Sequence, residues 1–95
     1  MKIKISEKAS AWYKEEMYVT EGDHIRFFAR YGGFSTVHPG YSLGMSKDEP
    51  FDLGIETIID GVHFFIEEKD LWYFDGHDLL VDVNPKIGEP EYIIA

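Results

Sequence analysis

The strongest structural signal in the chain is residues 55–66, which read Ile55-Glu56-Thr57-Ile58-Ile59-Asp60-Gly61-Val62-His63-Phe64-Phe65-Ile66. Asp-Gly between two apolar runs is typical of a two-residue hairpin with a type I′ turn. The turn also fixes the register of the two strands. The predicted cross-strand pairs are Ile59–Val62, Thr57–Phe64 and Ile55–Ile66. We expect this face to be core, and we expect the other face to meet a second packed layer or another copy of the chain, because it carries Ile58, His63 and Phe65.

Upstream of this hairpin, the sequence predicts a strand, a helix and a second strand. Ile3 and Ile5 alternate with lysines in the two-residue period of a half-buried strand. Ser6 can cap a helix over residues 7–18, whose apolar side should lay Trp12 against a sheet. Alternation returns over residues 24–31, and the glycine pair that follows permits a sharp loop.

The remaining segments predict more strands and one further helical turn. Residues 41–46 should form a strand after a Pro-Gly turn. Residues 67–74 lose the alternation, which predicts a short helical turn with Leu71 and Trp72 buried, and a strand over 79–83 follows. The proline-containing tail should be extended, and Tyr92-Ile93-Ile94 should form an edge strand or cover a neighbouring subunit. These elements predict one α+β domain over residues 1–95, mostly β, with an N-terminal helix and a short second helix.

Composition excludes several classes of function. The chain has 18 acidic and 9 basic side chains, and a formal net charge of −9 repels phosphate backbones, so we expect no nucleic-acid binding. No apolar run approaches the ~20 residues of a membrane span, which favours a cytoplasmic protein without a membrane partner. The absence of cysteine excludes disulfides and thiolate metal sites. We interpret the large aromatic side chains as core residues. They include Trp12, Tyr31, Tyr41, Phe51, Phe64, Trp72 and Phe74.

A loop and the strand after it resemble a known family. The segments are Arg30-Tyr31-Gly32-Gly33-Phe34-Ser35-Thr36 and Tyr41-Ser42-Leu43-Gly44-Met45, and Asp60-Gly61, Asp75-Gly76 and Asn84-Pro85 follow in order. This frame resembles the HesB-like, or A-type, iron–sulfur cluster carriers. The resemblance implies a two-layer antiparallel sheet or distorted barrel. Carriers place cysteine where Phe34 stands and a Cys-x-Cys pair after Asn-Pro, and this chain has neither. The resemblance therefore implies a non-enzymatic relative of iron–sulfur assembly proteins, without cofactor, that acts through a protein partner or as a homo-oligomer.

Two contact surfaces and one alternative metal site follow from this interpretation. The first surface is the loop of Gly32, Gly33, Phe34, Ser35 and His38. The second is a C-terminal interface of Asn84, Pro85, Tyr92, Ile93 and Ile94. The alternative hypothesis is an iron or zinc protein in which imidazoles and carboxylates replace sulfur. Its candidate ligands are His38, His24 and His77. We interpret the acidic runs near residues 48–52 and 67–70 as a solvated face.

Overall fold

The computed structural model describes residues 1–33 and 38–95. The described residues form the following elements in chain order: β1 (Ile3–Ile5), α1 (Glu7–Glu16), β2 (His24–Tyr31), β3 (Tyr41–Ser46), β4 (Leu53–Ile59), β5 (Val62–Glu67), the 3-10 helix η1 (Glu68–Phe74), β6 (Leu79–Asn84) and β7 (Glu89–Ile94). The fold is α+β and mostly strand, which confirms the class predicted from the sequence. Neither helix in this part of the chain has the length and apolar character that crossing a membrane requires.

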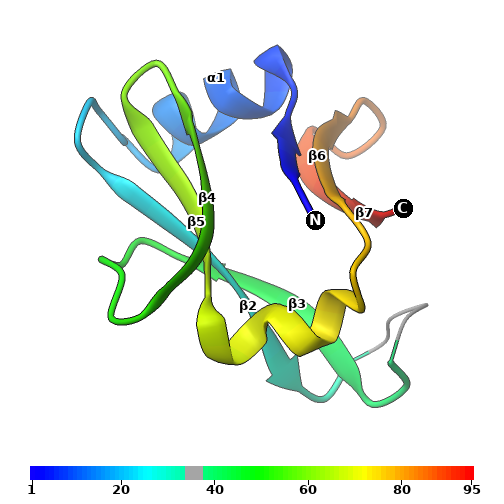
Figure 1. Cartoon of the computed structure of the whole chain (residues 1–95). Helices are drawn as coiled ribbons and strands as arrows, with labels where there is room; N and C mark the ends of the chain where they lie inside the picture. The colour runs from blue at the N-terminus through cyan, green and yellow to red at the C-terminus, as the bar shows by residue number, and fades with distance from the viewer. Residues whose placement is uncertain (34–37) are drawn as a thin grey trace.

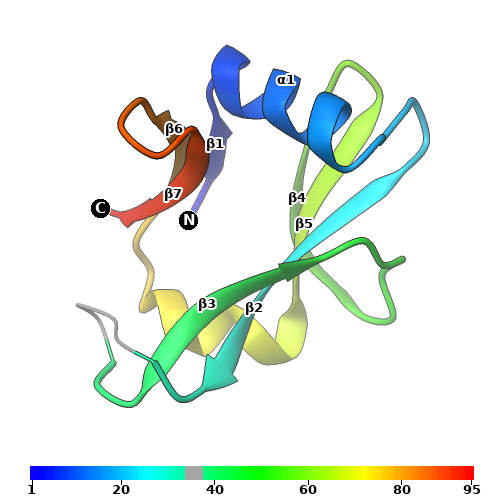
Figure 2. The same ribbon diagram turned by 180° about the vertical axis from the view of Figure 1, so that it is seen from behind.

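The strands form two separate sheets. One has the order β1-β6-β7 and the other β3-β2-β5-β4. Figures 1 and 2 show the sheets on opposite sides of the molecule, with α1 at one end and η1 at the other. The described strands do not close into a barrel, so the distorted barrel is wrong. The sheets are also not wholly antiparallel, as the resemblance implied, because β1 pairs with β6 and β2 with β5 in parallel.

The central hairpin has the predicted register. Ile59 pairs with Val62, Thr57 with Phe64 and Ile55 with Ile66. Asp60 and Gly61 have φ of 52° and 79°, the pair of positive angles that a type I′ turn requires. The second face of the hairpin differs in burial between its two strands, because Phe65 of β5 is fully buried whereas Ile58 of β4 is 52% exposed. β5 is therefore covered on both faces, while β4 at the sheet edge faces solvent on one.

The core lies between the sheets and the two helices. Its buried apolar members are Ile3, Ala9, Tyr13, Val19, Ile25, Phe27, Val62, Phe64, Ile66, Tyr73, Phe74, Leu79 and Val81. Tyr13 of α1 makes ring contacts with both Phe27 of β2 and Phe64 of β5. Trp12, expected to face a sheet, is only partly buried.

Several local predictions need correction. Helix α1 ends at Glu16, two residues early, because Tyr18 adopts a left-handed φ of 54°. In η1 the buried residues are Asp70, Tyr73 and Phe74, while Trp72 is 49% exposed. The tail forms β7, an edge strand antiparallel to β6, as predicted. Tyr31 and Phe51 were expected in the core, but they are 87% and 100% exposed.

Candidate functional site

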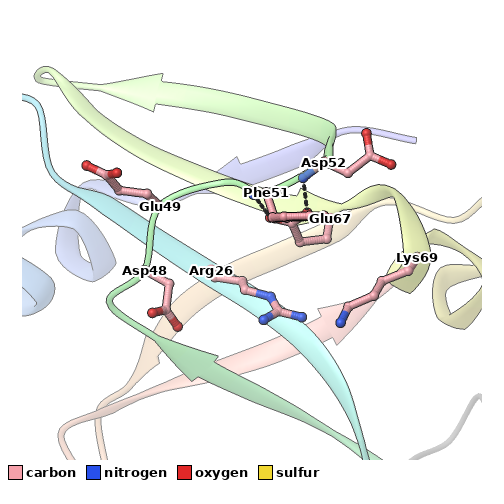
Figure 3. Close-up of a pocket in the computed structure, with 7 residues that line it drawn as sticks. All are labelled: Arg26, Asp48, Glu49, Phe51, Asp52, Glu67 and Lys69. Carbon is pink, nitrogen blue, oxygen red and sulfur yellow. Dashed lines mark hydrogen bonds between the residues drawn. The ribbon is translucent and has the colours of Figure 1, made fainter.

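The connection between β3 and β4 borders the pocket drawn in Figure 3. We call residues 47–52, Lys47-Asp48-Glu49-Pro50-Phe51-Asp52, the Phe51 loop. The pocket has a volume of about 420 Å³. It is lined by Arg26, Asp48, Glu49, Phe51, Asp52, Glu67 and Lys69. Three of the lining carboxylates therefore come from the Phe51 loop, and the cations come from β2 and η1.

Glu67, the last residue of β5, holds the Phe51 loop in place. Its side chain is buried, with 3% of the residue exposed, and its two carboxylate oxygens accept the backbone N–H groups of Phe51 and Asp52 at 2.7 and 2.6 Å. Burial raises the pKa of Glu67, but these two amides, together with the charges of Arg26 and Lys69, outweigh it and hold the pKa below its usual value. The carboxylate thus stays ionised and fixes the loop backbone.

Arg26 of β2 links the pocket to η1. Its Nη2 donates to Asp70 Oδ2 at 3.0 Å, and both side chains are largely buried. The guanidinium also lies over the Phe28 ring, with its carbon 5.1 Å from the ring centroid. Within the described residues, the buried Nε has no hydrogen-bond partner. Arg26 therefore joins two elements and keeps one donor without an acceptor in the described part of the chain.

These groups are suited to binding. The described lining residues offer carboxylates, a guanidinium, an ammonium and one aromatic ring, and none of them supplies a side-chain hydroxyl or imidazole that could act as a nucleophile with its base. Both oxygens of the buried carboxylate are already committed to backbone amides. The arrangement can present charge and an apolar ring to a partner molecule.

The glycine loop predicted as a contact surface lies beside a group of aromatic side chains, of which Tyr31 and Trp72 are exposed while His38 and Tyr41 are partly buried. We call Tyr31, His38, Tyr41 and Trp72 the aromatic cluster. Ring centroids are 5.6 Å apart for Tyr31 and Tyr41, 5.3 Å for Tyr41 and Trp72, and 5.2 Å for His38 and Trp72. Gly32 and Gly33 follow β2 directly. Phe34 and Ser35, the other two predicted loop residues, lie outside the described residues.

The predicted C-terminal interface is divided between turn, core and surface. Asn84 organises the β6–β7 turn before Pro85, because its Oδ1 accepts the Lys86 N–H at 2.9 Å and its Nδ2 donates to Glu91 at 3.1 Å. Tyr92 and Ile94 pack against the core. Ile93 is 44% exposed and remains available for contact. The structure therefore gives most of these residues a role in the fold.

The histidines named as metal ligands do not come together. Among the described residues, the one group of three potential ligands is His24, Glu56 and His63, whose ligand atoms lie within 4.8 Å of one another. The rings of His24 and His63 stack at 4.4 Å, and His63 Nδ1 lies 3.2 Å from Glu56 Oε2. His38 contacts Trp72 and Tyr73 instead, and His77 is exposed. Of the three predicted ligands His38, His24 and His77, His24 alone belongs to this group of described residues.

Sequence reasoning missed Phe51, Glu67 and Arg26. The acidic run 67–70 was interpreted as a solvated face, but Glu67 and Asp70 are buried and hold a loop and an arginine. One signal was present: Phe51 stands between Pro50 and Asp52 in an otherwise acidic segment, where no apolar period predicts its burial. The partners of Glu67 are backbone amides, which residue types do not reveal.

The fold and these surfaces define a small α+β protein that presents exposed aromatic rings and negative charge. No protein-family model matches the chain. It is 52% identical over 92 residues to the protein named pyruvate dehydrogenase inhibitor of Bacillus subtilis (strain 168), with 97% of each chain covered. It is 44% identical to an uncharacterized protein of Staphylococcus saprophyticus and 35% identical to one of Staphylococcus aureus, again over 97% of each chain. The chain belongs to the same protein family as the Bacillus subtilis pyruvate dehydrogenase inhibitor.

This family membership corrects the functional expectation. The full-length relative carries the name of an enzyme inhibitor, and no family model supports the resemblance to HesB-like iron–sulfur carriers. That resemblance rested on glycines, aromatic residues and Asp-Gly turns, which any hairpin-rich domain uses for backbone reasons. The iron–sulfur assembly role and its iron or zinc alternative are both withdrawn, because the relative's name points to regulation of an enzyme.

Proposed function

We propose that this protein is a non-enzymatic regulator that inhibits pyruvate dehydrogenase by binding to it. The observation that carries the proposal is the 52% identity, over 97% of both chains, to the Bacillus subtilis protein named for this activity. Identity at this level over nearly the whole of both chains supports a shared fold, and we extend it to a shared binding partner.

The surface supports this proposal. Phe51, Tyr31 and Trp72 are exposed by 100%, 87% and 49%. Aromatic side chains of this kind supply much of the binding energy at protein interfaces. A net charge of −9 favours a partner with a basic surface and speeds their encounter. The single domain over residues 1–95, the cytoplasmic location, the homo-oligomeric state and the two contact surfaces expected from the sequence stay predictions.

The direct test is inhibition by the purified protein. Pyruvate dehydrogenase from the organism that carries this chain is assayed for pyruvate oxidation with increasing amounts of the protein, and the Bacillus subtilis enzyme serves as a second source. We expect the rate to fall and to saturate, and we expect the two proteins to elute together in gel filtration. A small acidic protein of similar charge is the control. An unchanged rate together with separate elution would contradict the proposal.

A further inference from the structure

Phe51 is the most exposed aromatic residue among the described residues, at 100%. A ring exposed to this degree gains nothing from packing within its own chain, since the contribution of an apolar side chain scales with the area removed from water. Most other phenylalanines in the structure are fully buried; Phe27, Phe64, Phe65 and Phe74 have an exposure of 0%. Fold stability therefore does not account for an aromatic residue at position 51.

The backbone beneath this ring is held firmly. The amides of Phe51 and Asp52 donate to the buried Glu67 carboxylate, and the Asp52 carbonyl accepts the Glu68 N–H at 2.8 Å. Gly54 allows the start of β4 to lie close to the backbone of β5, because a Cβ at this position would lie 2.8 Å from the Ile66 carbonyl oxygen. Hydrogen bonds to an ionised carboxylate are stronger than those between two neutral groups. The ring is thus presented on a pre-organised backbone, which lowers the entropy lost on binding.

Acidic side chains surround the ring. Asp48, Glu49 and Asp52 are all exposed and lie within four positions of Phe51. All three line the pocket together with Arg26 and Lys69, and among the described residues Asp48 also accepts a hydrogen bond from Ser46 at 2.6 Å. Figure 3 shows these carboxylates and the two cations around one hollow. A complementary surface would therefore be apolar at its centre and basic at its rim.

We propose that Phe51 is the anchor through which this protein docks to the protein that it inhibits, inserting into an apolar pocket ringed by lysine or arginine side chains. This inference rests on the proposed function. It differs from the sequence-based expectation, which placed partner contact at the glycine loop and the C-terminal tail. The aromatic cluster is the competing surface. Its rings support one another, whereas no ring contact of Phe51 is found within residues 1–33 and 38–95, where its backbone amide is bonded to Glu67.

The test compares single substitutions by their affinity for pyruvate dehydrogenase, measured by surface plasmon resonance. We expect Phe51→Ala to weaken binding about tenfold or more, as is typical of an anchor residue. Ile87→Ser is the matched control, because Ile87 is 63% exposed and lies in the turn between β6 and β7. We expect this control to bind like the unaltered protein. Circular dichroism of each variant verifies the fold, which a fully exposed side chain should not disturb.

The charge component has its own readout. Glu49→Gln should slow association a few-fold and flatten its dependence on ionic strength, while the dissociation rate stays nearly unchanged. Placing a photo-crosslinking amino acid at position 51 should trap a segment of the enzyme that contains lysine or arginine.

The possible outcomes separate this inference from the proposed function. Unaltered affinity of Phe51→Ala overturns the inference and leaves the inhibitor proposal intact. Loss of binding in Tyr31→Ala or Trp72→Ala, with Phe51→Ala unaffected, assigns docking to the aromatic cluster and also overturns it. No binding by the unaltered protein contradicts the proposed function, and the inference with it.

Discussion

Glu67 shows how one residue can define a surface loop. A buried carboxylate is unfavourable unless hydrogen bonds replace its water, and here two backbone amides do so at 2.7 and 2.6 Å. The charges of Arg26 and Lys69 add to this. The same contacts fix the loop that carries Phe51, so Glu67 serves both the fold and the proposed binding surface.

Replacing Glu67 with glutamine should destabilise the protein by about 1–3 kcal/mol. The amide has one oxygen acceptor, so one of the two loop N–H groups would face an NH₂ group and lose its partner. Urea denaturation of the variant and the unaltered protein measures the difference. Glu49→Gln is the control, because the same chemical change at an exposed position should leave the free energy of unfolding nearly unchanged.

Stability should also depend on pH through Glu67. Its folded pKa lies below the unfolded value of 4.5, so its contribution is complete above that value and is lost as the pH falls through the folded pKa. We expect the unaltered protein to lose more stability than Glu67→Gln between pH 7 and pH 3. Urea denaturation midpoints of both proteins, measured across this pH range, test the prediction. An equal fall of the midpoint in the two proteins would contradict it.

At the scale of the element, the β4–β5 hairpin is specified by its turn. Gly61 has a φ of 79°, and a Cβ at this position would collide with the side chain of Glu21. The turn therefore packs against the segment that precedes β2, where the Gly22 N–H donates to the Gly61 carbonyl at 2.8 Å. The hairpin is held both by its own ladder and by this contact.

We expect Gly61→Ala to destabilise the protein by more than Gly76→Ala, the matched control. Both glycines have positive φ, 79° and 81°, so each substitution carries a backbone strain of roughly 1–2 kcal/mol. Only Gly61 also crowds Glu21, since no atom lies within 4 Å of a Cβ at Gly76. Thermal unfolding compares the two variants. Equal losses of stability would show that the Glu21 side chain moves aside freely.

The elements that the sequence predicts correctly are those with local causes. The hairpin register follows from Asp60-Gly61, and the start of α1 follows from Ser6, whose Oγ accepts the Ala9 N–H at 3.0 Å. The parallel pairing of β2 with β5 has no local signal, since it depends on contacts between distant segments. Trp72 was expected to be buried, but in η1 the neighbouring Tyr73 and Phe74 take the buried positions.

The candidate site was less predictable than the fold for a physical reason. Exposure of Phe51 depends on how a loop crosses the sheet, and that path depends on backbone amides bonded to a carboxylate 16 positions away. Residue type alone favours burial of phenylalanine. Residues that bind a partner break this rule, so a pattern-based interpretation assigns them to the core.

At the scale of the whole molecule, aromatic contacts hold the two sheets together. Tyr13 of α1 lies against Phe27 and Phe64 of the four-stranded sheet, and its hydroxyl lies 3.3 Å from that of Tyr92 on β7. Phe27 also contacts the Tyr92 ring, at 5.7 Å. Burial, together with the neighbouring Tyr92, raises the pKa of Tyr13, which keeps its hydroxyl neutral. The pair thus connects both sheets through the helix.

A double-mutant cycle tests this connection. Tyr13→Phe and Tyr92→Phe should each cost about 0.5–1.5 kcal/mol, because each leaves the other hydroxyl without its partner. The double variant should lose less than the sum of the two single losses. Additive losses, measured by urea denaturation, would show that the two hydroxyls do not interact.

Above pH 10 the unaltered protein should also lose stability, since Tyr13 ionises at 10.0 in the unfolded chain but stays neutral in the folded one.

The parallel pairing of β1 with β6 has a consequence for synthesis on the ribosome. Lys2, just before β1, donates its N–H to Asp78, 76 positions later. At about 5–20 residues per second, the first strand waits roughly 4–15 seconds for its neighbour to be translated. The strands of the other sheet, β2 to β5, are all made before β6 begins. Ile3 and Ile5 therefore gain their β6 partners, Leu79 and Val81, only after the whole four-stranded sheet has been synthesised.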